Sequence, residues 1–361
     1  MKNPKKILIL IQRSNGDVFL STSLIKGLYE YYESPHIDLL INDDTFSIAR
    51  LIPFIKNIYT FSYHEKKNNR WTQEKNLITK IFKKYDLSIN LTASDRSVLY
   101  ALIAAKKTIS AIEIDNKKSW WKKALLTQYY YFDKDKHILM NNLESLNLLN
   151  IKHDNIQQPI DVSSKVMSIM REKLSSLGIS DFIIFHPSAQ YGYKIYPHHL
   201  RNSLLESLST LNIPIVITGS KTQIDLEIKA TLPSSNNILD LIGETTLEEL
   251  FALSELSSAY IGMDTMNMHI AASQNKRIFA IFGPTILKTW SPWSNAFQKS
   301  ASEDMPVQTY DNITIFQDSL PCVACGNAGC DNKHGRSECL HNIDPNLIYK
   351  EIKNWHQNLY A

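Results

Sequence analysis

The chain has 361 residues, of which 43% are hydrophobic and 21% are charged, and its formal net charge is +3. This length allows two domains with a core each, and the composition is typical of a soluble globular protein. So small a positive excess does not indicate nucleic-acid binding, and we expect no nucleic-acid partner. Since no apolar run is long enough to span a bilayer and the N-terminal run lacks a cleavage pattern, we expect a cytoplasmic protein.

Short apolar runs alternate with longer amphipathic stretches along the chain, which is typical of β–α units on a parallel sheet. In the first half, strands are expected at 6–12, 37–42, 57–61, 86–91 and 107–112, with helices such as 17–32, 71–84 and 95–105. In the second half, strands are expected at 182–187, 213–219, 237–243, 257–262 and 277–283.

These units predict an α/β protein with two doubly wound domains, residues 1–158 and 159–344. The ligand crevice of such domains lies at the carboxyl ends of the strands. A last amphipathic segment, 345–361, is expected to form a helix that packs back towards the first domain.

The first predicted strand is followed by the turn RSNGDVFLST, residues 13–22. Gly16 permits a tight strand-to-helix turn, and Asp17 then stands near the start of a helix. Two interpretations of Asp17 remain open: a helix cap, or a general base that points into the crevice. A single glycine is not a GxGxxG fingerprint, so a dinucleotide is not expected here.

The segment 115–132, DNKKSWWKKALLTQYYYF, combines lysines with tryptophans. This pairing suits peripheral contact with an anionic membrane surface, because indole rings sit at the headgroup level. A solvated basic helix face explains it equally well. The residues concerned are Lys117, Lys118, Trp120, Trp121, Lys122 and Lys123.

Two strand-to-helix turns of the second half have the composition of phosphate-binding loops. In HPSAQYGYKIYP, Ser188 leaves backbone amides accessible and Lys194 supplies a cation, although an ordinary solvated lysine is the alternative. In ITGSKTQID, the turn Thr218-Gly219-Ser220 also opens at a helix N-terminus. Two such turns on adjacent units predict a diphosphate site.

The joint MDTMNMHIAA, residues 263–272, follows another apolar strand. Asp264 is a candidate acceptor of hydrogen bonds from sugar hydroxyls, and the following helix N-terminus favours an anion. His269, in the first turn, is expected to reach a phosphate or a hydroxyl, unless a backbone carbonyl already satisfies its ring. Met263, Met266 and Met268 are interpreted as packing residues.

Together, the segments NGDVFLSTSLIKGL, HPSAQYGYKIYP, ITGS, LIGETTLEELFAL and GMDTMNMHIAASQNKRIFAIFGPT resemble the heptosyltransferases of glycosyltransferase family 9. The resemblance implies a GT-B fold, in which two Rossmann-like domains face a cleft. It implies an acceptor on the first domain and ADP-heptose on the second. The implied reaction is inverting transfer of heptose to lipopolysaccharide, a lipid-linked saccharide, at the cytoplasmic face of the inner membrane.

The resemblance also implies roles for individual residues. Asp17 is the implied base, and Lys194 contacts phosphate and sugar. Asp264 binds the donor sugar, with Thr265 and His269 near the diphosphate. Met266 stands where the family usually has glycine and narrows the donor pocket.

Four cysteines fall within residues 322–339, with the spacing C-x2-C-x4-C-x8-C. In a cytosolic protein this spacing predicts structural zinc or iron rather than disulfides, and His334 is a possible substitute ligand. The cluster also resembles those of iron-containing heptosyltransferases that modify autotransporters. Four reduced thiols are the alternative. The predicted metal ligands are Cys322, Cys325, Cys330 and Cys339.

No catalytic metal is expected, because Lys194, His269 and the helix N-terminus supply positive charge for the leaving group. Two alternatives to the leading function stay open. One is a transferase of the same fold that uses another nucleotide sugar or glycosylates a protein. The other is a non-catalytic protein that binds a nucleotide sugar.

Overall fold

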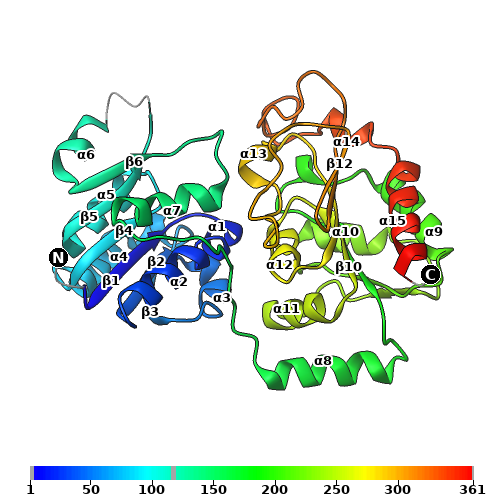
Figure 1. Ribbon diagram of the computed structural model, residues 1–361, viewed down its shortest axis with the longest axis horizontal. Helices are drawn as coiled ribbons and strands as arrows, with labels where there is room; N and C mark the ends of the chain where they lie inside the picture. The colour runs from blue at the N-terminus through cyan, green and yellow to red at the C-terminus, as the bar shows by residue number, and fades with distance from the viewer. Residues whose placement is uncertain (1–3, 115–118, 360–361) are drawn as a thin grey trace. The chain divides into compact units, whose positions relative to one another are not determined.

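The structure, a computed structural model, describes residues 4–114 and 119–359. The chain divides into two compact units, Met1–Asp161 and Val162–Ala361. Each unit is an α/β domain built on one sheet with helices on both faces; Figure 1 draws the first from blue to green and the second from green to red.

The first unit holds six parallel strands in the order β3-β2-β1-β4-β5-β6. The strand at its centre, KILILI, is buried from its second residue onward, as expected for a parallel strand covered on both faces. The bounds are β1 Lys6–Ile11, β2 His36–Asn42, β3 Ile55–Phe61, β4 Tyr85–Asn90, β5 Ala105–Ile112 and β6 Gln128–Tyr131.

Helices cover both faces of this sheet. Leu8 and Leu10 of β1 pack with side chains of α4 and α5, and α2 packs beside α7. The bounds are α1 Asn15–Phe19, α2 Thr22–Tyr31, α3 Phe46–Ala49, α4 Lys66–Ile81, α5 Asp95–Ala104, α6 Trp120–Leu125 and α7 Ile138–Leu148.

The second unit holds a seven-stranded sheet in the order β12-β13-β11-β10-β7-β8-β9, parallel except for β12, which runs antiparallel to β13. The bounds are β7 Ile183–His186, β8 Ile215–Ile217, β9 Ile238–Asp240, β10 Ala259–Met263, β11 Arg277–Ile281, β12 Val307–Tyr310 and β13 Ile313–Phe316.

Successive residues of β7 point to opposite faces, as in any strand. Phe185 packs with residues of α9 and α15, and Ile184 packs with residues of α8, α11 and α12. The bounds are α8 Ser164–Ser176, α9 His198–Ser209, α10 Gln223–Ala230, α11 Leu247–Leu256, α12 Met266–Ser273, α13 Leu287–Trp290, α14 Glu338–His341 and α15 Pro345–Leu359.

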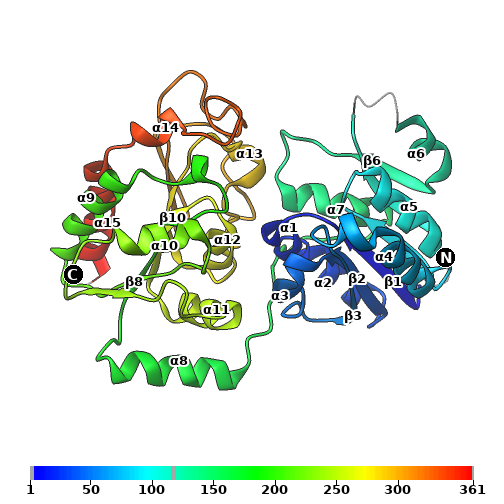
Figure 2. The ribbon, with the colours of Figure 1, turned by 180° about the vertical axis from the view of Figure 1, so that it is seen from behind.

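The C-terminal helix α15 lies beside α9 in both views (Figures 1 and 2). Its buried residues Ile348 and Ile352 belong to the core of the second unit, and Trp355 contacts the ring of Phe279. The apolar face of this helix is therefore buried within the second unit, and the expected packing towards the first domain stays a prediction.

The strand order of each sheet reverses once, between β1 and β4 in the first unit and between β7 and β10 in the second. Doubly wound sheets bind ligands outside the carboxyl ends of the strands at this switch point. The loop after β1 carries Asp17, and the loop after β7 carries Lys194. Both sheets therefore present predicted site residues where the fold favours a ligand.

Candidate functional site

Lys194 and Asp264 form an ion pair at the carboxyl edge of the second sheet, with Nζ 2.7 Å from Oδ2. Asp264 is 8% exposed, and the Lys194 side chain is 25% exposed. Burial alone would lower the pKa of Lys194, but the neighbouring carboxylate outweighs burial and raises it. The ammonium group is therefore held charged and partly accessible beside the end of β10.

Asp225 joins the two predicted phosphate loops, and the sequence analysis missed it. Its Oδ2 accepts hydrogen bonds from Ser220 Oγ at 2.6 Å and from the Thr222 hydroxyl, and the Ser188 side chain also bonds to it. Burial would raise the pKa of Asp225, but these hydrogen bonds outweigh it and lower the pKa. A Cβ on Gly219 would meet Asp225 Oδ1 at 2.8 Å, so this turn requires glycine.

The side chains of Ser188 and Ser220 are therefore engaged with a protein group. Both side chains bond to the same carboxylate, which fixes the two loops against each other. Thr222 and Asp225 form a capping box at the start of α10, and this T-x-x-D spacing is the signal that marks Asp225.

His186, the last residue of β7, is a second group that the sequence analysis left unassigned. Its Nδ1 lies 3.0 Å from Thr218 Oγ1, and Asn267 Nδ2 lies 2.9 Å from the ring nitrogens. Burial lowers the pKa of His186 to about 4. The ring is therefore neutral near pH 7 and links the ends of β7 and β8 to the first turn of α12.

The depressed pKa of His186 predicts a pH-dependent stability. The unfolded chain takes up the proton near 6.5 and the folded chain only near 4, so stability is lost as the pH falls through this window. Between about pH 7.5 and 5 the loss is roughly 2 kcal/mol. Denaturant unfolding of wild type and His186→Gln at both pH values should show this extra loss in wild type only; equal losses would contradict the prediction.

The start of α12 differs in part from expectation. Thr265 is the N-cap residue, and Met266 in the first turn is partly exposed, whereas Met263 and Met268 are core residues. His269 is 4% exposed. The side chain is therefore buried at the start of α12, and its contact with a diphosphate stays a prediction.

Asp17 lies in the first turn of α1 and is 6% exposed. Its Oδ2 accepts hydrogen bonds from Ser14 Oγ at 2.6 Å and from the Ser14 backbone N at 3.2 Å. Its Oδ1 pairs with Arg13 Nε at 2.7 Å. The capping interpretation is therefore confirmed, and it does not exclude a second role for this carboxylate.

The predicted metal centre is not formed. Among residues 4–114 and 119–359, no three His, Cys, Asp or Glu side chains are grouped so that they could hold a metal ion. Cys322, Cys325 and Cys330 are exposed and Cys339 is buried. Burial, and then the neighbouring Cys330, raise the pKa of the Cys339 thiol to about 12.

The cysteine-bearing loop instead packs against the loop that carries Lys194. The ring of His334 stacks on Tyr191 with centroids 5.2 Å apart and lies 5.6 Å from Tyr193. Ser337 Oγ donates a hydrogen bond to the Tyr193 carbonyl at 2.7 Å. The segment expected to be a metal clip thus supports the neighbourhood of Lys194 through aromatic and backbone contacts.

Not all lysines of the proposed membrane segment, residues 115–132, are exposed at the surface. Lys122 has a fully buried side chain that pairs with Asp95 and Glu113 at 2.9 and 3.0 Å. The Trp120 side chain is 72% exposed. Residues 115–118, which include Lys117 and Lys118, lie outside the described residues. Within the described part of the chain, no helix is long and apolar enough to cross a membrane. Peripheral membrane contact stays a prediction.

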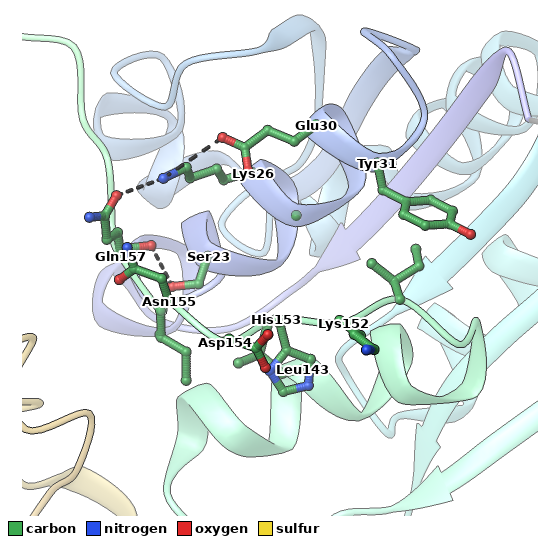
Figure 3. A pocket seen from close by; sticks show the side chains of 13 residues that line it. Ser23, Lys26, Glu30, Tyr31, Leu143, Lys152, His153, Asp154, Asn155 and Gln157 are labelled. Carbon is green, nitrogen blue, oxygen red and sulfur yellow. Dashed lines mark hydrogen bonds and ion pairs between the residues drawn. The ribbon is translucent and has the colours of Figure 1, made fainter.

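A pocket of about 450 Å³ lies on the flank of the first unit, between α2, α7 and residues 151–157 (Figure 3). None of the predicted site residues lines it. Lys26 Nζ is bonded to Gln157 Oε1 at 2.6 Å, and Ser23 Oγ to the Gln157 carbonyl at 2.7 Å. These polar groups hold the segment that leads to the second unit. We therefore assign the candidate site to the carboxyl ends of the strands in the two sheets and not to this pocket.

Comparison with known proteins identifies the family. Residues 75–315 match the model of glycosyltransferase family 9 (heptosyltransferase). The chain is 27% identical over 291 residues to lipopolysaccharide heptosyltransferase 3 of Escherichia coli K12, covering 78% of this chain and 83% of that protein.

Two solved structures share the fold. The E. coli ADP-heptose lps heptosyltransferase II matches with a TM-score of 0.71 at 20% identity, over 99% of this chain and 100% of that one. The iron-containing dodecameric glycosyltransferase TibC from enterotoxigenic E. coli matches with a TM-score of 0.54 at 10% identity, over 99% of this chain and 78% of that one. The family match and the two Rossmann-like sheets show that this chain belongs to glycosyltransferase family 9, the heptosyltransferases, and is a glycosyltransferase with the GT-B fold.

Proposed function

We propose that the protein transfers heptose, with inversion, from ADP-heptose to a lipopolysaccharide-type, lipid-linked saccharide. The observation that carries the proposal is the Lys194–Asp264 pair, placed at the switch point of the second sheet in a chain of this family. The names of the similar proteins, a lipopolysaccharide heptosyltransferase and an ADP-heptose heptosyltransferase, support the donor and the class of acceptor.

The donor belongs on the second unit in this proposal. Lys194 contacts the diphosphate and compensates the negative charge that grows on it as the sugar leaves. Asp264 accepts hydrogen bonds from the sugar hydroxyls, and the N-terminus of α12 at Thr265 adds about 0.3–1 kcal/mol towards an anion. The turn Thr218-Gly219-Ser220, fixed by Asp225, directly follows β8.

The acceptor belongs on the first unit, where Asp17 acts as the general base. Asp17 takes the proton of an acceptor hydroxyl, and the hydroxyl oxygen forms a bond to the anomeric carbon of the heptose. The bond from that carbon to the diphosphate oxygen breaks, and ADP leaves with the electron pair. Attack from the face opposite the diphosphate inverts the anomeric centre.

The donor assignment is tested by thermal stabilisation of the purified protein with ADP, ADP-heptose, UDP and GDP. A ligand at about 100 times its dissociation constant adds roughly 2.7 kcal/mol to the stability of the folded state. We expect ADP and ADP-heptose to raise the melting temperature, and UDP and GDP to leave it unchanged.

Other outcomes discriminate the alternatives. Stabilisation by UDP or GDP alone would retain the fold and refute the heptose donor. If none of the four nucleotides stabilised the protein, the donor site proposed on the second unit would be wrong.

A further inference from the structure

Three aromatic side chains gather beside the Lys194–Asp264 pair. The rings of Tyr191 and Tyr193 stack with their centroids 5.5 Å apart and their planes at 15°. The ring of His334 lies 5.2 Å from that of Tyr191 and 5.6 Å from that of Tyr193. These three residues, the aromatic cluster, come from the loop after β7 and from the cysteine-bearing loop.

The aromatic cluster extends from the ion pair to the surface. Burial lowers the pKa of Lys194, and Asp264, followed by the phenols of Tyr193 and Tyr191, raises it. Since charges act strongly only over short distances, both tyrosines border the pair. Tyr191 is 41% exposed, and His334 is also exposed. These two rings are therefore accessible to a ligand next to the pair.

The loop that carries His334 is fixed by its own hydrogen bonds. The His334 backbone N–H donates to the Ala328 carbonyl at 2.7 Å. The Asp331 carboxylate accepts the backbone N–H groups of Lys333 and Gly335 at 2.9 and 3.2 Å. The ring of His334 is thus held in place before a ligand binds, and a preorganised surface loses little entropy on binding.

Exposed aromatic rings that are held in place favour a ligand with a flat apolar face. Tyrosine offers such a ligand a large, rigid contact area with a hydroxyl at its edge. One face of a sugar ring consists largely of C–H bonds and its edge carries hydroxyl groups, so a saccharide complements both parts of a tyrosine. A nucleotide base is the competing ligand, since bases also stack on aromatic rings.

Position favours the saccharide over the base. Burial raises the pKa of Tyr193, Lys194 lowers it, and Tyr191 and Asp264 raise it further, so this phenol lies near both members of the pair. In the proposed function Lys194 binds the diphosphate and Asp264 the donor sugar, and the base lies on the far side of the diphosphate from that sugar. The donor sugar is held at Asp264, so a second sugar that reaches the exposed rings belongs to the acceptor.

We propose that Tyr191 and His334 stack against a sugar ring of the acceptor saccharide, so that the second unit supplies an acceptor subsite next to the donor site. The inference rests on the proposed function, because it takes Asp264 as the contact of the donor sugar. It extends the acceptor contacts beyond the first unit. It also gives the cysteine-bearing loop a part in acceptor recognition.

The test measures KM and kcat for heptose transfer from ADP-heptose to a truncated lipopolysaccharide, together with the dissociation constant of ADP-heptose. The variants are Tyr191→Ala, Tyr191→Phe and His334→Asn. Asparagine is chosen because position 334 has a φ of 66°, which asparagine tolerates. Tyr31→Ala is the matched control, because Tyr31 is also an exposed tyrosine whose ring lies against a second one, Tyr32, at 5.0 Å.

Tyr191→Ala and His334→Asn should each raise the KM for the acceptor by about 5- to 30-fold, the range expected when a central contact residue is truncated. The kcat at saturating acceptor and the dissociation constant of ADP-heptose should stay at the wild-type values. Tyr191→Phe keeps the stacking ring and should retain most of the affinity, and Tyr31→Ala should behave as wild type. The double variant should raise KM by less than the product of the single effects, because each ring supports the other.

Two outcomes would overturn the proposal. If both single variants kept the wild-type KM for the acceptor, the rings would not contact it. If Tyr191→Ala weakened the binding of ADP-heptose, the aromatic cluster would serve the donor or only hold Lys194 in place.

Binding of the oligosaccharide released from the same lipopolysaccharide, followed by saturation-transfer NMR, separates these failures from a failure of the proposed function. Binding that Tyr191→Ala abolishes supports the subsite even if wild type transfers no heptose, and then the proposed function alone is refuted. Heptose transfer by wild type, with oligosaccharide binding unchanged in both variants, refutes the subsite alone. If wild type neither binds the oligosaccharide nor transfers heptose, both are refuted.

Discussion

Asp17→Asn is expected to lower kcat by roughly 10²–10⁴-fold while the affinity for ADP-heptose stays unchanged. Asparagine has the size of aspartate and keeps an oxygen for the hydrogen bonds from Ser14, but it does not accept a proton at neutral pH. The donor is assigned to the other unit, so its binding should survive. Steady-state kinetics at saturating donor, with calorimetric titration of ADP, measure the two quantities.

A capping effect of Asp17 must be separated from a catalytic one. Glu249 offers the control, since it occupies the same third position of a capping box at the start of α11, with Oε2 2.7 Å from the Thr246 backbone N. Glu249→Gln keeps an oxygen for the Thr246 N–H and loses only the charge near the helix N-terminus, so it should cost about 0.3–1 kcal/mol of stability without a large fall in kcat. If Asp17→Asn behaved like Glu249→Gln, Asp17 would be a cap only.

The central strands of both sheets were predictable because a local run of apolar residues indicates a buried strand. The sequences of β1 and β11 are short apolar runs. A parallel strand that is covered by helices on both faces requires such a run. β6, β12 and β13 were missed. β6 and β12 contain partly exposed residues at sheet edges, so long-range pairing decides them and local pattern does not. β13 is a buried run of four residues, ITIF, whose apolar pattern the sequence does contain.

The site was predictable as a set of residues but not as a set of contacts. Lys194 and Asp264 are 70 positions apart and meet because β7 pairs with β10. Ser188 and Ser220 meet at Asp225 because β7 pairs with β8. Strand order is a tertiary property, so the ion pair and the Asp225 clamp follow only from the fold.

The direction of a side chain is a further property that local pattern does not give. His269 is buried at the start of α12, and its contact with a diphosphate stays a prediction. Lys122 was counted as a surface cation, but Asp95 and Glu113 allow its burial by compensating the charge. The cysteine spacing was a weaker indicator than it appeared because spacing alone does not bring thiols to one point.

Lys194→Met is expected to lower kcat by roughly 10²–10³-fold, because the lost ammonium no longer compensates the charge that develops on the departing diphosphate. It also leaves Asp264, 8% exposed, without its cation. Removal of one partner from a buried pair costs about 3–5 kcal/mol, and the partial exposure of Lys194 should reduce this to about 1–3 kcal/mol.

The double variant Lys194→Met/Asp264→Asn separates the two effects of Lys194. A neutral amide at position 264 no longer needs a cation, so the free energy of unfolding should return towards the wild-type value. The rate should stay low, because neither the charge on the diphosphate nor the carboxylate for the sugar is restored. Denaturant unfolding and kcat at saturating donor measure both. Recovery of the rate together with the stability would show that Lys194 serves only to neutralise Asp264 and has no part in the departure of ADP.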